Sequence, residues 1–200
     1  MWVQEQVRIL PEGVRITTLS HNPAEIQITT NHEGGQISIE ILDSENHQVV
    51  TAKGDDIKVK IPNAKLWNHE HPYLYTCRIN AENEGKIVET RDIKFGVRYI
   101  TWSTKGFFVN GEKVLLKGGC VHHDNGVIGA CSYEKSEYRR VRILKESGYN
   151  AIRSSHNPAS VSMIQACDEL GMYMMEETWV MWVIPKLQYD YSSDFLNNYK

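Results

Sequence analysis

The stretch over residues 117–177 constrains the fold most strongly, because short apolar strands alternate there with helical segments. Apolar runs at 149–152 and 172–175 predict strands, and apolar residues at every third position predict helices over 133–146 and 157–171. Such alternation predicts parallel strands joined by right-handed crossovers. In a (β/α) barrel the active site lies at the C-terminal ends of the strands, but a barrel has eight strands. This stretch supplies only three of them, namely a strand that ends in the segment Gly118 to Asp124 and the two apolar runs.

The ends of the two predicted helices carry residues suited to helix termini. Gly148 and Gly171 stand where glycine commonly ends a helix. Asn157 is a suitable N-cap for the second helix, and Pro158 suits its first turn. The buried face of the second helix is expected to consist of Val161, Ile164, Cys167 and Leu170.

The first half of the chain predicts a β-sandwich over residues 1–98. Polar and apolar residues alternate over 25–29, 36–41 and 56–61, which is typical of strands with one buried face. Turn residues separate these strands at intervals of roughly ten residues, as in a sandwich. The composition changes near residue 98, so we expect residues 99–200 to form the incomplete N-terminal part of a TIM-barrel domain.

Two local features near the junction have clear structural interpretations. Asn110-Gly111 lies between apolar runs and predicts a tight β-hairpin. Leu66-Trp67 and the Pro72-Tyr73-Leu74-Tyr75 stretch form an aromatic corner. We interpret this corner as part of the core, because large aromatic side chains dominate core packing. Sugar stacking is the alternative, but polar partners are missing nearby in sequence.

Charge and hydropathy argue against nucleic-acid and membrane partners. The net charge is −3, whereas nucleic-acid-binding domains show clustered Lys and Arg. The longest basic run lies on the first predicted helix, and we interpret it as a solvated face; it comprises Arg139, Arg140, Arg142 and Lys145. Apolar runs fall short of the ~18 residues that span a bilayer.

The termini and the cysteines say little about location. The segment Met1 to Glu5 does not resemble a signal peptide, and the compartment is left open between bacterial cytoplasm and periplasm. The four cysteines show no CxxC spacing, so neither a disulfide framework nor a zinc knuckle is expected. Cys77 and Cys167 lie on apolar faces and are interpreted as buried small hydrophobic residues.

Histidines follow the first two strands of the barrel-like stretch. His122-His123-Asp124 and His156 should converge on one mouth, where they could hold a metal ion or grip sugar hydroxyls. A metal site needs at least three convergent ligands. His122 and His123 are adjacent and should point to opposite sides of an extended strand, which weakens the metal interpretation.

The second strand also contains an arginine, which needs an acceptor. Arg153 is expected to pair with a carboxylate, either in a structural salt bridge or to orient a catalytic group. Glu176 and Glu177 are adjacent, so at most one of them should face the mouth. Trp179 and Trp182 are equally compatible with a sugar-stacking wall and with core residues at a helix start.

At these residues the chain resembles glycoside hydrolase family 2, the family of retaining β-galactosidases, β-glucuronidases and β-mannosidases. The motifs that carry the resemblance extend over nearly the whole chain: Leu66-Trp67, Pro72 to Tyr75, Phe95 to Arg98, Phe107 to Gly111, Lys117-Gly118, His122-His123-Asp124 with Gly129-Ala130, Asn150 to Pro158, Cys167 to Gly171, and Glu177. The stretch from Arg153 to Pro158 is highly specific in this context. The His-His-Asp motif is similar to that of a bacterial β-galactosidase-like subgroup.

The resemblance implies an immunoglobulin-like sandwich followed by the first three β/α units of a (β/α)8 barrel. It implies that His122 and His156 bind hydroxyls of the non-reducing sugar and that Arg153 hydrogen-bonds the nucleophilic glutamate. The full expected substrate-binding set is His122, His123, Asp124, Arg153, His156, Glu177 and Trp179. The family's two catalytic glutamates follow later strands, so we expect both beyond Lys200 and none in this chain. The resemblance implies neither a metal nor another cofactor.

We therefore expect this chain to be a piece of a retaining β-glycosidase that acts on terminal β-galactosides, and to be inactive alone. The open edges of a three-strand piece predict self-association into a homo-oligomer. A non-catalytic carbohydrate-binding or adhesive module is the alternative, with the sandwich as its working part. A metal-dependent barrel hydrolase, with an ion at His122 and His156, is a third hypothesis.

Overall fold

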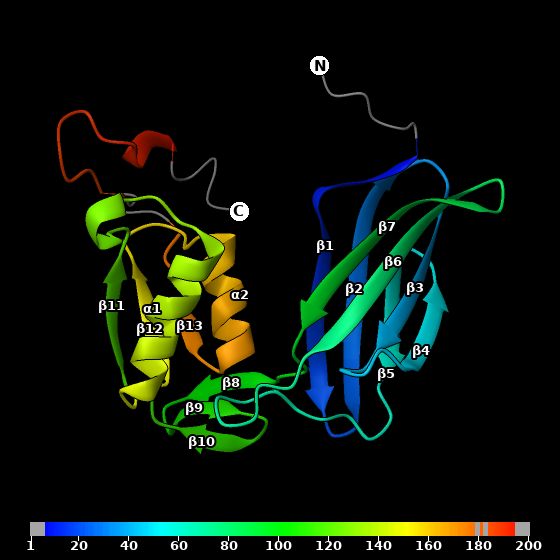
Figure 1. Cartoon of the computed structure of the whole chain (residues 1–200), viewed down its shortest axis with the longest axis horizontal. Coiled ribbons are helices and arrows are strands. Elements are labelled where there is room, and N and C mark those ends of the chain that lie inside the picture. The colour runs from blue at the N-terminus through cyan, green and yellow to red at the C-terminus, as the bar shows by residue number, and fades with distance from the viewer. Residues whose placement is uncertain (1–6, 179–180, 182–183, 195–200) are drawn as a thin grey trace. The chain divides into compact units, whose positions relative to one another are not determined.

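The computed structural model describes residues 7–178, 181 and 184–194, and it divides the chain into two compact units, Met1–Val114 and Leu115–Lys200 (Figure 1). This division falls later in the chain than residue 98, since the small hairpin sheet groups with the first unit. The expected domain boundary between residues 98 and 99 stays a prediction. Among the described residues, no helix has both the length and the apolar character needed to cross a membrane.

The first unit contains the expected sandwich. One sheet has the order β1–β2–β5 and the other the order β4–β3–β6–β7, with antiparallel neighbours throughout. The strands are β1 (Arg8–His21), β2 (Ala24–Glu33), β3 (Gln36–Leu42), β4 (Gln48–Lys53), β5 (Asp56–Lys60), β6 (Tyr75–Asn83) and β7 (Lys86–Phe95). Ile26 and Ile28 of one sheet share a core with Ile39 and Ile79 of the other, so alternation along each strand builds one shared interior.

The aromatic corner belongs to the core, as expected. Trp67 is fully buried, and its backbone N–H donates to the Val97 carbonyl at 2.9 Å. A Cβ atom on Gly96 would lie 2.6 Å from the Trp67 ring, so glycine permits this close approach. The Arg98 guanidinium lies 4.7 Å from the centroid of that ring. Trp67 therefore has no exposed face on which a sugar could stack.

The Asn-Gly hairpin forms where the sequence predicts it. Strands β8 (Ile100–Ser103), β9 (Gly106–Val109) and β10 (Glu112–Val114) form an antiparallel sheet in the order β10–β9–β8. Asn110 and Gly111 both have positive φ angles, 53° and 83°, as a tight two-residue turn requires. The Asn110 amide donates to the Trp67 carbonyl at 3.0 Å, which ties the hairpin to the aromatic corner.

The second unit is the start of a (β/α) barrel. Strands β11 (Gly118–His122), β12 (Ala151–Ser155) and β13 (Tyr173–Met175) are parallel and lie in the order β11–β12–β13. The connections contain a short 3₁₀ turn, η1 (Gly126–Ile128), and the helices α1 (Glu134–Glu146) and α2 (Val161–Leu170). Val141, Ile152 and Met163 share one apolar cluster, so both helices cover the same face of the sheet (Figure 1).

Two details of α2 differ from the sequence-based expectation. The helix is capped by Ser160 rather than Asn157, because the Ser160 hydroxyl accepts from the Met163 N–H at 3.1 Å. The expected buried residues Val161 and Ile164 are 64% and 39% exposed. The buried face instead contains Met163, Ala166 and Cys167, because a period of 3.6 combines steps of three and four residues. Gly171 ends the helix in the left-handed conformation, as predicted.

Candidate active site

The parallel register of the three strands places several polar side chains on one face of the sheet. Cys120 pairs with Arg153, and His122 pairs with Ser155. Side chains alternate along a strand, so these four lie on the face opposite to Val121, Ile152 and Ser154. Val121 and Ile152 pack on the helices. We call the face turned away from α1 and α2 the inner face and the helix-covered face the outer face.

Arg153 is the central side chain of the inner face. Its Nη2 forms an ion pair with Glu177 Oε1, and its Nη1 donates to Cys120 Sγ and to Ser155 Oγ, both at 3.0 Å. The side chains of Arg153 and Glu177 are 37% and 24% exposed. The hydrogen bond with Cys120 and the nearby charge of Glu177 both raise the pKa of Arg153. Of the two adjacent glutamates, Glu177 is therefore the one that meets the arginine.

His156 lies beside this ion pair, and His122 contacts His156. His156 Nδ1 is 3.5 Å from Glu177 Oε2. The rings of His122 and His156 meet edge to face, with centroids 5.2 Å apart. The structure thus brings together His122, Arg153, His156 and Glu177 at the C-terminal ends of parallel strands. That arrangement offers a cation, a carboxylate and two imidazoles to a polyhydroxylated ligand; whether these groups bind one stays a prediction.

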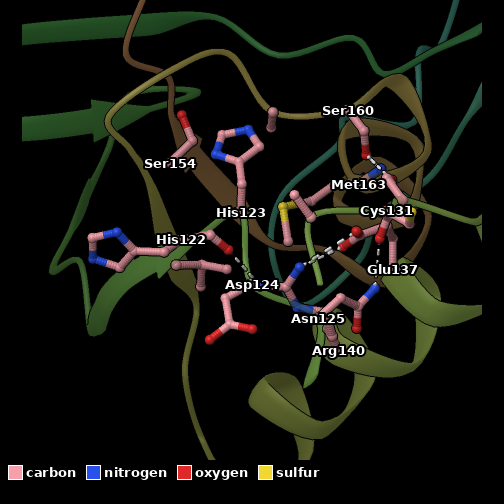
Figure 2. Close-up of a pocket in the computed structure, with 14 residues that line it drawn as sticks. His122, His123, Asp124, Asn125, Cys131, Glu137, Arg140, Ser154, Ser160 and Met163 are labelled. Atoms are coloured by element: carbon pink, nitrogen blue, oxygen red, sulfur yellow. Dashed lines mark hydrogen bonds and ion pairs between the residues drawn. The ribbon is translucent and has the colours of Figure 1, made fainter. Parts of the chain in front are cut away.

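The neighbours of these residues in the sequence turn to the outer face. His123 Nε2 lies 2.9 Å from the Pro158 carbonyl oxygen. Glu176 Oε1 accepts a hydrogen bond from the Ala159 N–H. The Ser154 hydroxyl accepts from the Glu177 N–H at 3.1 Å. Figure 2 shows His122 and His123 pointing in different directions, as adjacent residues of an extended strand must.

The close-up in Figure 2 shows a pocket on the outer face, between the end of β11 and the helices. Asp124 faces its own loop, where Oδ1 accepts from the Gly126 N–H at 3.2 Å. Arg140 Nη2 donates to the His122 carbonyl at 2.9 Å. Its Nη1 also lies 3.2 and 3.3 Å from the two carboxylate oxygens of Glu137.

Sequence reasoning missed the role of Arg140, which it placed on a solvated helix face. The Arg140 side chain is only 18% exposed, and that of Glu137 is 4% exposed. A glutamate three residues before an arginine, on the side of the helix that carries Val141, could have indicated this pair. The interpretation of this basic run as solvated is therefore wrong for Arg140.

Cys120 is a second residue that the sequence analysis did not place in the site. It lies two residues before His122 on the same strand, so strand alternation alone could have placed it on the inner face. Hydrogen bonds with the Ser155 hydroxyl and with Arg153 lower the pKa of the Cys120 thiol. The thiol is therefore a polar neighbour of the arginine.

Other sequence-based expectations concern metal ligands, cysteines and tryptophans. In the part of the chain that the structure describes, there is no group of three or more His, Cys, Asp or Glu side chains able to hold a metal ion. Cys77 and Cys167 are buried free thiols, as expected. Trp179 and Trp182, the proposed stacking wall, lie outside the described residues.

These observations define the class: a β-sandwich followed by the first units of a (β/α) barrel, with polar residues gathered at the barrel strand ends. Comparison with known families gives the same two domains in the same order. The model for glycosyl hydrolases family 2 matches residues 11–98, and the model for the TIM barrel domain of the same family matches residues 100–191. The two matches together cover most of the chain, and the chain belongs to glycosyl hydrolases family 2.

The individual relatives that the chain matches are much longer than the chain. It is 35% identical over 140 residues to the beta-galactosidase BoGH2A of Bacteroides ovatus, a match covering 70% of this chain and 16% of the relative. A solved family 2 member from Bacteroides cellulosilyticus superposes with a TM-score of 0.85 at 31% identity, over 97% of this chain and 28% of that one. A beta-glucuronidase structure from Faecalibacterium prausnitzii gives a TM-score of 0.77 at 26% identity, covering 86% and 28%. The chain spans between 16% and 24% of the first curated relatives.

Proposed function

We propose that this chain is part of a longer retaining β-glycosidase that hydrolyses terminal β-galactosides. The observation that carries the proposal is the inner-face cluster of His122, Arg153, His156 and Glu177 at parallel strand ends. Family membership supports the reaction class. Relatives of this chain are named as β-galactosidases and as β-glucuronidases, which supports a β-glycosidase.

In the proposed reaction, this chain supplies binding and orientation and later strands supply the chemistry. His122 and His156 bind hydroxyls of the terminal sugar. Arg153 orients the nucleophilic glutamate, which attacks the anomeric carbon while a second carboxylic acid protonates the departing oxygen. Water then releases the sugar from the covalent intermediate; the two carboxyl groups of retaining enzymes are ~5–5.5 Å apart. Neither is expected within residues 1–200, so the chain alone is proposed to be inactive.

The choice of a galactoside over a glucuronide rests on charge. A uronic acid substrate carries a carboxylate, which calls for a cationic partner. Arg153 is already paired with Glu177, which leaves its charge largely offset. The described inner face therefore favours a neutral sugar, in line with the beta-galactosidase relatives.

The test is an assay of the full-length protein on the nitrophenyl β-galactoside, β-glucuronide and β-mannoside. We expect the highest kcat/KM on the galactoside, with retention of anomeric configuration seen by NMR. The isolated 1–200 chain should show no turnover. Binding of galactosides by the full-length protein without hydrolysis would instead support a carbohydrate-binding module, and loss of activity with a chelator would support a metal-dependent hydrolase.

We also propose that the isolated chain self-associates. Within the described residues, β11 and β13 each have one strand neighbour, so both edges of the parallel sheet present unpaired backbone groups. Sedimentation of the 1–200 chain should show oligomers that increase with concentration. A monomer at all concentrations would contradict this proposal without affecting the proposed reaction.

A further inference from the structure

The loop between β12 and α2 is held by side chains from the strands on both sides of it. His123, from the end of β11, contacts the Pro158 carbonyl oxygen at 2.9 Å. Glu176, from the end of β13, accepts the Ala159 N–H. The two contacts fall on consecutive loop residues. Each neighbouring strand thus contributes one polar side chain to the backbone of the same loop.

The chemistry of each contact determines which group donates. A carbonyl oxygen can only accept, so His123 must carry a proton on Nε2. A backbone N–H can only donate, so Glu176 is the acceptor at Ala159. Both side chains are therefore matched to their partners, and alanine at either position would remove the hydrogen bond made there.

The far end of the loop is fixed separately. The Ser132 hydroxyl bonds the Ser160 hydroxyl at 2.7 Å, and Ser160 caps α2 through the Met163 N–H. The near end follows β12 and carries His156, whose side chain is 49% exposed. Because about half of this side chain is exposed, the backbone that carries His156 contributes to its placement beside Glu177 and His122.

We propose that His123 and Glu176 are positioning residues that clamp residues 156–160 and so place His156 for the terminal sugar. We call these two residues the loop clamp. The inference rests on the proposed function for its catalytic part, and it gives His123 a role other than the substrate binding expected from the sequence. Strand alternation explains the arrangement: His122 and Glu177 face the inner side, and their sequence neighbours His123 and Glu176 hold the loop.

The structural part of this proposal can be tested without any substrate. Hydrogen–deuterium exchange of the full-length protein should show faster exchange in the peptide containing Ala159 for Glu176→Ala than for the wild type. We expect a factor of about ten or more, because a hydrogen bond to a charged group is lost. Glu176→Gln keeps an acceptor and should remain close to the wild type. Unchanged exchange in Glu176→Ala would overturn the clamp even if the enzyme proved inactive on every glycoside.

The catalytic part uses double-mutant cycles with His156→Ala. Glu176→Ala and His123→Ala should each lower kcat/KM on the nitrophenyl galactoside by about tenfold to a hundredfold, since small misplacements cost that much. Glu176→Gln and His123→Gln, which keep the acceptor and the donor, should recover most of it. In the His156→Ala background both alanine variants should have little further effect, because they act through that residue.

The control is Glu134→Ala, an exposed change of the same kind on α1. All variants are compared at a temperature where circular dichroism shows them folded. Full additivity of Glu176→Ala with His156→Ala would overturn the positioning role. Failure of the wild type to cleave any glycoside would overturn the proposed function, while the exchange experiment would still decide on the clamp.

Discussion

The pair formed by Glu137 and Arg140 allows a prediction in which stability and activity separate. The two side chains are 4% and 18% exposed, and the Arg140 guanidinium also donates to the His122 carbonyl at 2.9 Å. Replacing Arg140 by methionine leaves the Glu137 carboxylate buried without its cation. The same replacement removes the donor that fixes the backbone at the inner-face histidine. One substitution should therefore affect both unfolding and catalysis.

The magnitude follows from the burial and the distances. Breaking a buried pair by removing one partner costs ~3–5 kcal/mol. The Nη1–Oε distances of 3.2 and 3.3 Å are longer than the ~2.7–2.9 Å of strong charged pairs, so Arg140→Met should cost about 3 kcal/mol. A complete barrel domain has ~250 residues, for which 1 kcal/mol shifts the melting temperature by about 2–4 °C. The melting temperature of the barrel domain in the full-length protein should therefore fall by roughly 6–12 °C.

A double variant separates the two effects. Replacing a buried pair by apolar residues of similar volume is often neutral for stability. Glu137→Leu with Arg140→Met should therefore restore the melting temperature to near that of the wild type. Activity should stay about tenfold low, because the His122 carbonyl still lacks its donor and small displacements are costly.

The assays are differential scanning calorimetry of the full-length protein and kcat/KM on nitrophenyl β-galactoside. An unchanged melting temperature for Arg140→Met would refute the burial argument. Full activity in the double variant would show that the bond from Arg140 to His122 is irrelevant to the site. The first result would support the solvated helix face that the sequence suggested for Arg140, and the second would leave its burial unaffected.

Three further predictions concern the arginine, the thiol and the aromatic corner. Arg153→Lys removes the planar guanidinium that reaches three partners, so kcat/KM should fall about a hundredfold. The melting temperature should change little. An unaffected kcat/KM would contradict this prediction. The lowered pKa of Cys120 means that its thiolate persists to lower pH than an ordinary thiol, so iodoacetamide labelling followed by mass spectrometry should have its midpoint at lower pH. Ser155→Ala should move that midpoint upward, and no movement would argue against the hydrogen bond as the cause. Gly96→Ala should lower the free energy of unfolding of the sandwich in urea by about 1–3 kcal/mol, because the new Cβ would lie 2.6 Å from the Trp67 ring. A change below about 0.5 kcal/mol would show that the ring can move aside.

Local patterns in the sequence were sufficient for most of the architecture. Alternation at residues 25–29 and 36–41 predicted β2 and β3, and Asn110-Gly111 predicted the hairpin. These features depend on neighbours within a few positions, which is the range over which propensity and turn chemistry act. Parallel strands were predictable because helices separate them in sequence, and a crossover of that kind leaves little choice of direction.

The sequence by itself determined that the polar residues of the barrel-like stretch gather at one end of parallel strands. Tertiary structure decided which of them share a face. It selected Glu177 over Glu176 as the partner of Arg153, turned His123 to the loop and buried Arg140 under the strand end. The physical reason is that a side chain's direction depends on strand register and on contacts with residues 17 to 35 positions away, such as Glu176 with Ala159 and His123 with Pro158. Sequence spacing alone does not specify those distances in space.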